Sequence, residues 1–413
     1  MGSGGSRAPQ RSEHRLVRLL GPAFVAAIAY VDPGNVAANL SAGAKYGYLL
    51  VWVLVLANAM AVIVQYLSAK LGLVTGRSLP EMLGDRMPRT SRVLFWVQAE
   101  LVAVATDLAE VIGGALALAI LFDLPLLLGG VIVGAVSMGI LALQRGGQRR
   151  FEHVIVALLA VITVGFVAGL FVSPVDWGGA AGGLVPRFDG TETVLLAASM
   201  LGATVMPHAI YLHSSLARDR HGVTSDPGRI RMLLRVTRWD VVLALVVAGG
   251  VNIAMLLLAA SSLAGVEGTD TIPGAAAAIS THLGPAIGVI FGIGLLASGL
   301  ASTSVGSYAG AEIMGGLLRI RIPLMLRRLL TMLPALAVLA FGVDPTWALV
   351  LSQVALSFGI PFAIVPLIWL TGRRSVMGEF VNGRALAIAA VVTAVLIVAL
   401  NVLLIALTAS GQG

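Results

Sequence analysis

Two short motifs place polar or metal-binding side chains beside a proline, inside long apolar stretches of the chain. The first is Asp32-Pro33-Gly34-Asn35 and the second is Met206-Pro207-His208. Proline has no backbone N–H and glycine has little preference for helix, so each motif predicts a break in a membrane helix. Freed backbone groups are tolerated in hydrocarbon only where protein or a wet cavity surrounds them. A simple kink is the alternative for each motif taken alone.

The side chains at the two breaks suit a divalent transition-metal ion. Asp32 offers a carboxylate, Asn35 an amide oxygen on the same side of the resumed helix, and Met206 a thioether. Calcium prefers six to eight oxygen ligands, and magnesium sheds water reluctantly, whereas a soft sulfur favours transition metals. Met206 would therefore discriminate against hard cations. A capping role for Asp32 and simple packing for Met206 are the structural alternatives.

Three acids, Glu100, Asp107 and Glu110, are spaced by seven and three residues in another apolar stretch. This spacing puts them on one helix face, and acidic stripes inside membranes often relay protons. Glu100 could instead form an ion pair near the cytoplasmic end. Either Arg327 or Arg328 could be the basic partner of these acids.

Composition indicates what kind of chain positions these groups. It is 58% hydrophobic and 11% charged, has a mean hydropathy of +0.96 and contains no cysteine. Such values predict an all-α membrane protein without disulfides. A spanning helix needs about 20 apolar residues. Eleven stretches qualify, at about 17–41, 47–74, 92–121, 124–145, 151–173, 193–217, 239–264, 274–303, 323–342, 346–371 and 384–409.

The basic residues predict the orientation of these spans. With residues 1–16 as a disordered cytoplasmic tail, every Lys and Arg except Lys45 and Arg187 falls in a segment predicted to be cytoplasmic. This asymmetry follows the positive-inside rule and puts the C-terminus outside. The formal charge of +7 is then explained by topology, and we expect no nucleic-acid partner.

The two breaks fall in the first and the sixth spans. Five intervening spans give the corresponding units opposite orientations, and paired broken helices in inverted halves indicate a transport site at the bilayer midplane. We therefore expect one transporter domain, 17–413, with a first repeat at 17–173, a second at 193–371 and an eleventh helix at 384–409.

Together the two motifs resemble the Nramp divalent metal transporters, in particular bacterial manganese transporters of the MntH type. The likeness extends through Gln98-Ala99-Glu100, the stretch from Ala105 to Glu110, and Leu351-Ser352-Gln353. The resemblance implies a LeuT-like fold, with helices 1–5 and 6–10 as inverted repeats plus helix 11. It also implies alternating access, in which spans 1 and 6 move against a more static scaffold.

The resemblance also implies ligands and substrates. Asp32, Asn35 and Met206 match the family's metal-binding side chains, and the Ala203 carbonyl matches its backbone ligand. The Ala29 carbonyl and Gln353 match ligands used in some conformations. The expected cargo is Mn²⁺ or Fe²⁺, with Cd²⁺, Co²⁺ and Zn²⁺ accepted; members that carry aluminium or magnesium lack the methionine.

Proton coupling is a further implication of the resemblance. It supports relay roles for Asp107 and Glu110, adds His208 near the metal, and favours Arg328 over Arg327 as the basic partner. His208 could instead hydrogen-bond the unwound backbone. We expect a monomer without cofactor in the bacterial cytoplasmic membrane, with metal ions, protons and lipid as its partners.

Three other classes fit the motifs less well. The sequence has neither the His-Glu-x-x-His pattern of a membrane metalloprotease nor a Gly-x-Ser-x-Gly elbow, so we expect no enzyme. A sodium-coupled amino-acid or amine carrier of the same fold would not need an acid beside a thioether. A channel would usually repeat one polar ring over symmetric subunits.

Overall fold

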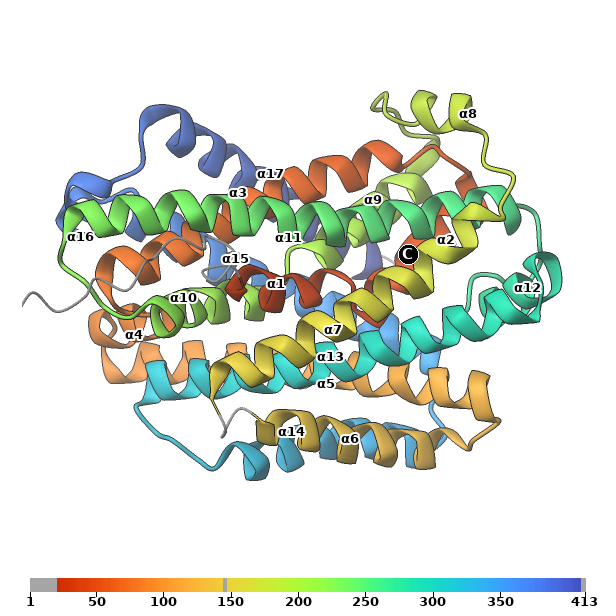
Figure 1. Ribbon diagram of the computed structural model, residues 1–413, viewed down its shortest axis with the longest axis horizontal. Helices are drawn as coiled ribbons and strands as arrows, with labels where there is room; N and C mark the ends of the chain where they lie inside the picture. The colour runs from red at the N-terminus through yellow and green to blue at the C-terminus, as the bar shows by residue number, and fades with distance from the viewer. Residues whose placement is uncertain (1–20, 144–146, 410–413) are drawn as a thin grey trace, which may run out of the picture.

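The computed structural model describes residues 21–143 and 147–409, so the expected tail at 1–16 and its arginines lie outside the described residues. The described chain is built from helices and has no strand (Figure 1). The elements are α1 Pro22–Ala27, η2 Ile28–Tyr30, α2 Pro33–Tyr46, α3 Val51–Thr75, α4 Leu79–Arg86, α5 Arg89–Phe122, α6 Leu126–Ala142, α7 Gln148–Val167, η4 Ala168–Phe171, α8 Trp177–Gly182, α9 Gly190–Thr204, α10 Pro207–His221, α11 Pro227–Ser262, α12 Ile272–Leu283, α13 Pro285–Leu318, α14 Leu324–Ala340, α15 Pro345–Thr371, α16 Arg374–Met377, η5 Gly378–Phe380 and α17 Arg384–Ala409.

Within the described residues each predicted span is largely helical, and the all-α membrane class is confirmed. Eight segments of the described chain are long and apolar enough to cross a bilayer, the run from α9 through α10 counted as one. Of the other three predicted spans, α6 and α14 are shorter, with 17 residues each. The first span is divided into α1, η2 and α2, as the Pro33-Gly34 break requires.

The predicted eighth span, 274–303, is wrong in its boundaries. Gly284 has a φ of 101° and is followed by Pro285, and the two end one helix and begin another. Positive φ is accessible to glycine, and proline suits the first turn of a helix. The stretch is therefore divided between the short α12 and the long α13, which continues to Leu318.

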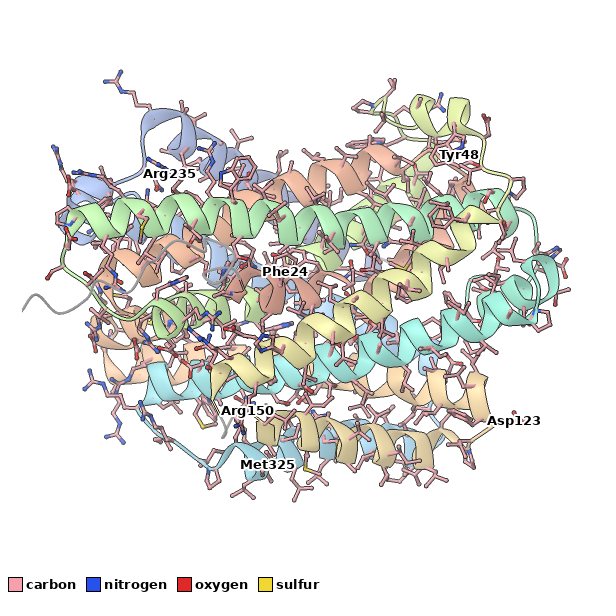
Figure 2. The ribbon with its side chains drawn as sticks, viewed as in Figure 1. Phe24, Tyr48, Asp123, Arg150, Arg235 and Met325 are labelled. Atoms are coloured by element: carbon pink, nitrogen blue, oxygen red, sulfur yellow. The ribbon has the colours of Figure 1, made fainter. Side chains whose placement is uncertain are left out.

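The segments predicted to be cytoplasmic gather at one end of the helix bundle. Arg319 binds Asp85 of α4, and Arg231 of α11 binds Glu379 near α16. Figure 2 shows Arg235 and Arg150 in the left half of the view, whereas Tyr48 lies to the right. Lys45, predicted to lie outside, pairs with Glu192 at the start of α9. The grouping of loops agrees with the predicted topology.

Small residues bring the central helices into close contact. A Cβ atom on Gly299 of α13 would lie 2.9 Å from the Cα of Gly114 in α5. One on Gly113 would collide with the ring of Pro33, the first residue of α2. Small interfacial residues allow helix backbones to approach closely in membranes. Helix α5 thus packs directly against the break in the first span.

We expect Gly113→Ala to destabilise the protein by about 1–3 kcal/mol, because the added methyl group overpacks against a rigid proline ring. Gly139→Ala is the matched control, since Gly139 lies in α6 with open space around its Cα. That control should be neutral or slightly stabilising. Thermal unfolding in detergent measures both variants, and equal melting temperatures would contradict the packing interpretation.

Candidate functional site

The first break places the Asp32 carboxylate at the N-terminus of a half-helix. Asp32 is extended, with φ −76° and ψ 168°, and α2 begins at Pro33. Its Oδ1 accepts hydrogen bonds from the Asn35 backbone N–H at 2.8 Å and from Asn35 Nδ2 at 2.7 Å. Its Oδ2 has no hydrogen-bond partner among the described residues, although Asp32 is fully buried. The carboxylate therefore caps the helix with one oxygen and keeps the other available.

The second break has the same form on the other half of the chain. Met206 is extended, with φ −77° and ψ 123°, and α10 begins at Pro207. Met206 is fully buried. Asn35 Nδ2 donates to the carbonyl of Ala203 at 3.1 Å, which joins the two breaks directly. With Nδ2 engaged twice, the oxygen of the Asn35 amide is the atom left to face a cation.

The two prolines explain why one backbone carbonyl at each break lacks its helical hydrogen-bond donor. In an α-helix the N–H of a residue bonds the carbonyl four residues earlier, and proline has no N–H. Pro33 therefore leaves the carbonyl of Ala29 without its helical donor, and Pro207 leaves that of Ala203. Each break thus supplies a freed carbonyl and a side chain just before the proline.

Gln353 of α15 completes one side of this group. A Cβ atom on Gly34 would collide with Gln353 Nε2 and lie 3.4 Å from Asp32 Oδ2, so the amide lies against the first break. Neither polar atom of the Gln353 side chain has a hydrogen-bond partner among the described residues. Gly34 is needed here because a larger residue would displace this amide.

The assembled donors are one carboxylate, two amides, a thioether and two carbonyls. Between 21–143 and 147–409 no three His, Cys, Asp or Glu side chains form a metal cluster. A cation held by this mixed set would meet a thioether, which favours a transition metal, and oxygens, which suit manganese.

The predicted acids lie on one face of α5, and two of them, Glu100 and Asp107, pair with different arginines. Arg327 Nη2 contacts both oxygens of Glu100, at 2.7 and 2.8 Å. Arg328 Nη1 lies 2.9 Å from Asp107 Oδ1, and both side chains are almost completely buried. The sequence offered Arg327 and Arg328 as alternatives, whereas in the structure both pair with an acid of α5. Since α14 supplies both arginines in succession, two ion pairs join α14 to α5.

Glu110 lies between the paired acids and the first break. Its carboxylate interacts electrostatically with Asp107, Asp32 and Arg328. The residue is fully buried, with the Thr303 hydroxyl beside its carboxylate. Glu110 thus interacts electrostatically both with Asp32 and with the Asp107–Arg328 pair.

Two histidines of α10 differ in their surroundings. Both ring nitrogens of His208 lack hydrogen-bond partners in the described part of the chain. His213 Nδ1 instead lies 2.7 Å from Gln65 Oε1, and Gln65 Nε2 donates to the Tyr30 hydroxyl at 2.7 Å. The signal that could have found this connection is Gln65, a polar residue in the apolar α3.

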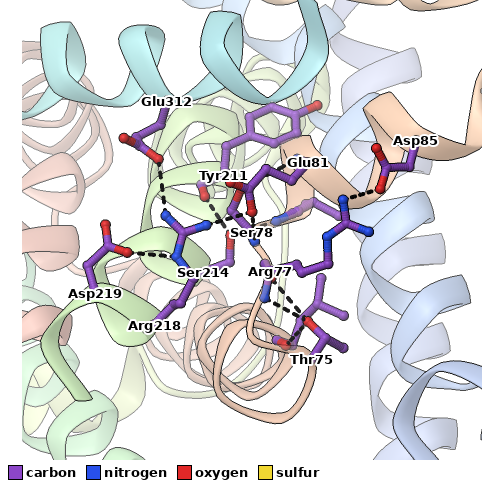
Figure 3. Close-up of polar contacts among 12 residues, drawn as sticks. Thr75, Arg77, Ser78, Glu81, Asp85, Tyr211, Ser214, Arg218, Asp219 and Glu312 are labelled. Carbon is purple, nitrogen blue, oxygen red and sulfur yellow. Dashed lines mark hydrogen bonds and ion pairs between the residues drawn. The ribbon is translucent and has the colours of Figure 1, made fainter. Parts of the chain in front are cut away.

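The site is closed toward the predicted cytoplasmic side. Residues 25–31 of α1 and η2 are buried, and the start of α1 is held by Asp240, which accepts from the N–H groups of Gly21 and Ala23 at 3.0 Å. Figure 3 shows a second closure, in which Arg218 of α10 contacts Glu81 of α4 at 2.5 Å and Glu312 of α13 at 3.8 Å.

The corner that receives Arg218 is itself ordered by polar contacts. Ser78 and Glu81 form a capping box at the start of α4, and the Leu79 N–H donates to Ser214 Oγ of α10 at 2.9 Å. Arg77 and Arg319 both pair with Asp85 at the end of α4 (Figure 3 shows Arg77). Although desolvation raises the pKa of Asp85, these arginines hold it below its ordinary value.

Comparison with known proteins identifies related sequences along almost the whole chain. The family described as natural resistance-associated macrophage protein-like, or Nramp, matches residues 23–407. A Mycobacterium tuberculosis protein named divalent metal cation transporter MntH is 63% identical over 395 residues, covering 95% of this chain and 92% of that protein.

Solved structures share the fold. A manganese transporter from Eremococcus coleocola superposes with a TM-score of 0.88 at 30% identity, covering 97% of this chain and 88% of that one. Mhp1, a nucleobase-cation-symport-1 family transporter, superposes with a TM-score of 0.59 at 17% identity, covering 97% of this chain and 94% of its own. The second likeness concerns the fold alone.

We expect Arg328→Ala to lower the free energy of unfolding by about 3–5 kcal/mol, because it leaves the Asp107 carboxylate buried without a countercharge. Adding Asp107→Ala should recover part of that loss. Arg231→Ala is the matched control, since Arg231 and Glu379 are also 2.9 Å apart but are 63% and 50% exposed. Its expected cost is below about 1 kcal/mol. Thermal unfolding of the four proteins distinguishes these outcomes, and similar losses for both arginines would refute the assignment.

Proposed function

The chain belongs to the Nramp family, and on that premise we propose that it imports Mn²⁺ and Fe²⁺ through the site at its two helix breaks. It is a divalent metal cation transporter of all-α, LeuT-like architecture. Asp32, Asn35, Met206 and the Ala203 carbonyl bind the ion, and Ala29 and Gln353 join them in some conformations. The observation that carries this proposal is the contact between Asn35 and Ala203, which unites both breaks in one buried donor set.

The charge of the site favours transport over storage. Asp32 supplies the single carboxylate, so a bound dication keeps an uncompensated positive charge, which helps its release. The Met206 thioether supplies the selectivity, because soft sulfur binds transition metals better than it binds Ca²⁺ or Mg²⁺. Cd²⁺, Co²⁺ and Zn²⁺ fit the same donors.

Protons accompany the metal through the acids of α5. A dication beside Asp32 disfavours a proton on the Asp32 carboxylate. Glu110 interacts electrostatically with both Asp32 and Asp107, so it is placed to receive that proton. The released proton passes by way of Glu110 and Asp107 toward Glu100, with Arg328 and Arg327 stabilising the charged acids. His208, whose ring nitrogens are unpaired in the described structure, assists near the metal.

Alternating access moves the broken helices against the remaining scaffold. The first repeat, 17–173, and the second, 193–371, each contribute one broken helix, and helix 384–409 lies outside the repeats. Opening toward the cytoplasm requires release of Arg218 from Glu81 and Glu312, together with release of α1 from Asp240. The protein acts as a monomer in the bacterial cytoplasmic membrane, with its N-terminus inside and its C-terminus outside.

Proteoliposomes containing the protein should take up Mn²⁺, and acid outside should accelerate uptake because protons enter with the metal. Asp32→Ala should abolish this uptake, since the variant loses the site's one carboxylate. Radioactive or fluorescent Mn²⁺ uptake measures both effects.

Asp270→Ala is the control for Asp32→Ala, because Asp270 is exposed and lies in the loop between α11 and α12. It should transport normally. Retained Mn²⁺ uptake in Asp32→Ala would remove Asp32 from the site, and uptake insensitive to the proton gradient would remove the coupling.

Met206→Ala should keep Mn²⁺ uptake while admitting more Ca²⁺ or Mg²⁺, because oxygen ligands alone discriminate poorly in favour of transition metals. Competition of Ca²⁺ and Mg²⁺ against Mn²⁺ uptake measures the change. Met200→Ala controls for lost packing volume, because Met200 of α9 is also a fully buried methionine. An unchanged selectivity in Met206→Ala would contradict the filter role.

A further inference from the structure

Two scaffold side chains bind the unwound backbone just before Asp32. Asn252 Nδ2 of α11 donates to the carbonyl of Tyr30 at 2.7 Å. Ser298 Oγ of α13 donates to the carbonyl of Val31 at 2.5 Å. Asn252 is 3% exposed and Ser298 is fully buried, so both bonds form away from bulk water. Helices α11 and α13 lie on opposite sides of α1 in Figure 1 and hold the break from two directions.

Asn252 also connects the two sides of the break. Its Oδ1 accepts from Asn39 Nδ2 of α2 at 2.9 Å, while its Nδ2 binds Tyr30 before the break. The bond from Asn39 fixes which end of the Asn252 amide points at the backbone. One side chain of α11 thereby sets the position of the segment before Asp32 relative to the helix after it.

These bonds and two backbone hydrogen bonds occupy the carbonyls on either side of Ala29. The Ile28 carbonyl accepts from the Val31 N–H at 3.1 Å, and that of Asp32 accepts from the Val36 N–H at 3.1 Å. The carbonyl of Tyr30 accepts from Asn252, and that of Val31 accepts from Ser298. Pro33 supplies no N–H to Ala29. The carbonyl of Ala29 is therefore the one in this segment that its neighbours leave available.

We propose that Ser298 and Asn252 are positioning residues for metal binding: by occupying the carbonyls of Val31 and Tyr30, they make the Ala29 carbonyl the backbone ligand of the first break. This inference rests on the proposed function, because it deepens the account of the same site. Neither residue touches the ion. Their effect is transmitted through the backbone that carries Ala29 and Asp32.

Ser302 offers a matched control for Ser298. Both serines are on α13, one turn apart, and both are fully buried. Ser302 Oγ donates to the Ser298 carbonyl of its own helix at 2.8 Å, whereas Ser298 Oγ reaches across to Val31. Substitution by alanine removes the same atom from the same environment in both cases. Only Ser298→Ala releases the unwound segment.

The test measures Mn²⁺ and Cd²⁺ binding to the purified full chain by calorimetry, with melting temperatures recorded for each variant. Ser298→Ala should weaken Mn²⁺ binding about fivefold, the effect expected for one buried hydrogen bond. Cd²⁺ binding should weaken less than about twofold, because Cd²⁺ depends more on the Met206 sulfur than on carbonyl oxygen. Ser302→Ala should change neither ion's affinity, and Asn252→Ala should reproduce the Ser298→Ala pattern.

Equal Mn²⁺ affinities in Ser298→Ala and Ser302→Ala would overturn the inference. Equal weakening of Mn²⁺ and Cd²⁺ would also overturn it, because a merely structural role predicts no preference between the ions. Asp32→Ala separates this result from the proposed function: the site assignment fails if that variant still binds Mn²⁺ normally. If Asp32→Ala loses Mn²⁺ binding while Ser298→Ala and Ser302→Ala have equal Mn²⁺ affinities, only the positioning role is refuted.

Discussion

A proline cannot donate a backbone hydrogen bond, and the rest of this site depends on that constraint. In a bilayer a carbonyl without a donor must find another partner inside the protein. Pro33 and Pro207 create this demand at Ala29 and Ala203. The structure meets it at Ala203 with Asn35, which comes from the opposite half of the chain, and leaves the Ala29 carbonyl available. A backbone defect repeated in two segments thus becomes the basis of the donor set that we propose for the metal.

The sequence was sufficient to predict much of this arrangement. Both breaks, the acids of α5 and the all-α class follow from residue types and hydrophobic runs that local chemistry determines. The start of α13 was predicted wrongly because Gly284 and Pro285 interrupt an otherwise apolar stretch, and hydropathy does not register their backbone geometry. The assignment of Arg327 to Glu100 and Arg328 to Asp107 depends on the rotation of α14 against α5, which no local pattern encodes. Asn252 and Ser298 were missed for the same reason, since their partners are backbone atoms more than 200 residues away.

The electrostatic contacts fall into two groups with different mechanical consequences. The pair between Asp107 and Arg328 is buried, so separating it would leave costly uncompensated charges. The contacts of Arg218 with Glu81 and Glu312 are partly exposed, so water can solvate these charges when the contacts separate. The scaffold helices α5 and α14 are thus fixed to one another, whereas the closure of α10 can be released at low energetic cost. This division suits a transporter whose broken helices move while the helices that carry the buried acid–arginine pairs stay in place.

The alanines at 29 and 203 have a consequence for how such a site is studied. Their contribution comes from the main chain, so nearly any side chain that fits could stand there without altering the ligand. Alanine scanning leaves both positions unchanged and would therefore overlook these two main-chain oxygens. The residues that reveal them are the prolines four positions later, where even a change to alanine restores an N–H and lets the helix close over its own oxygen.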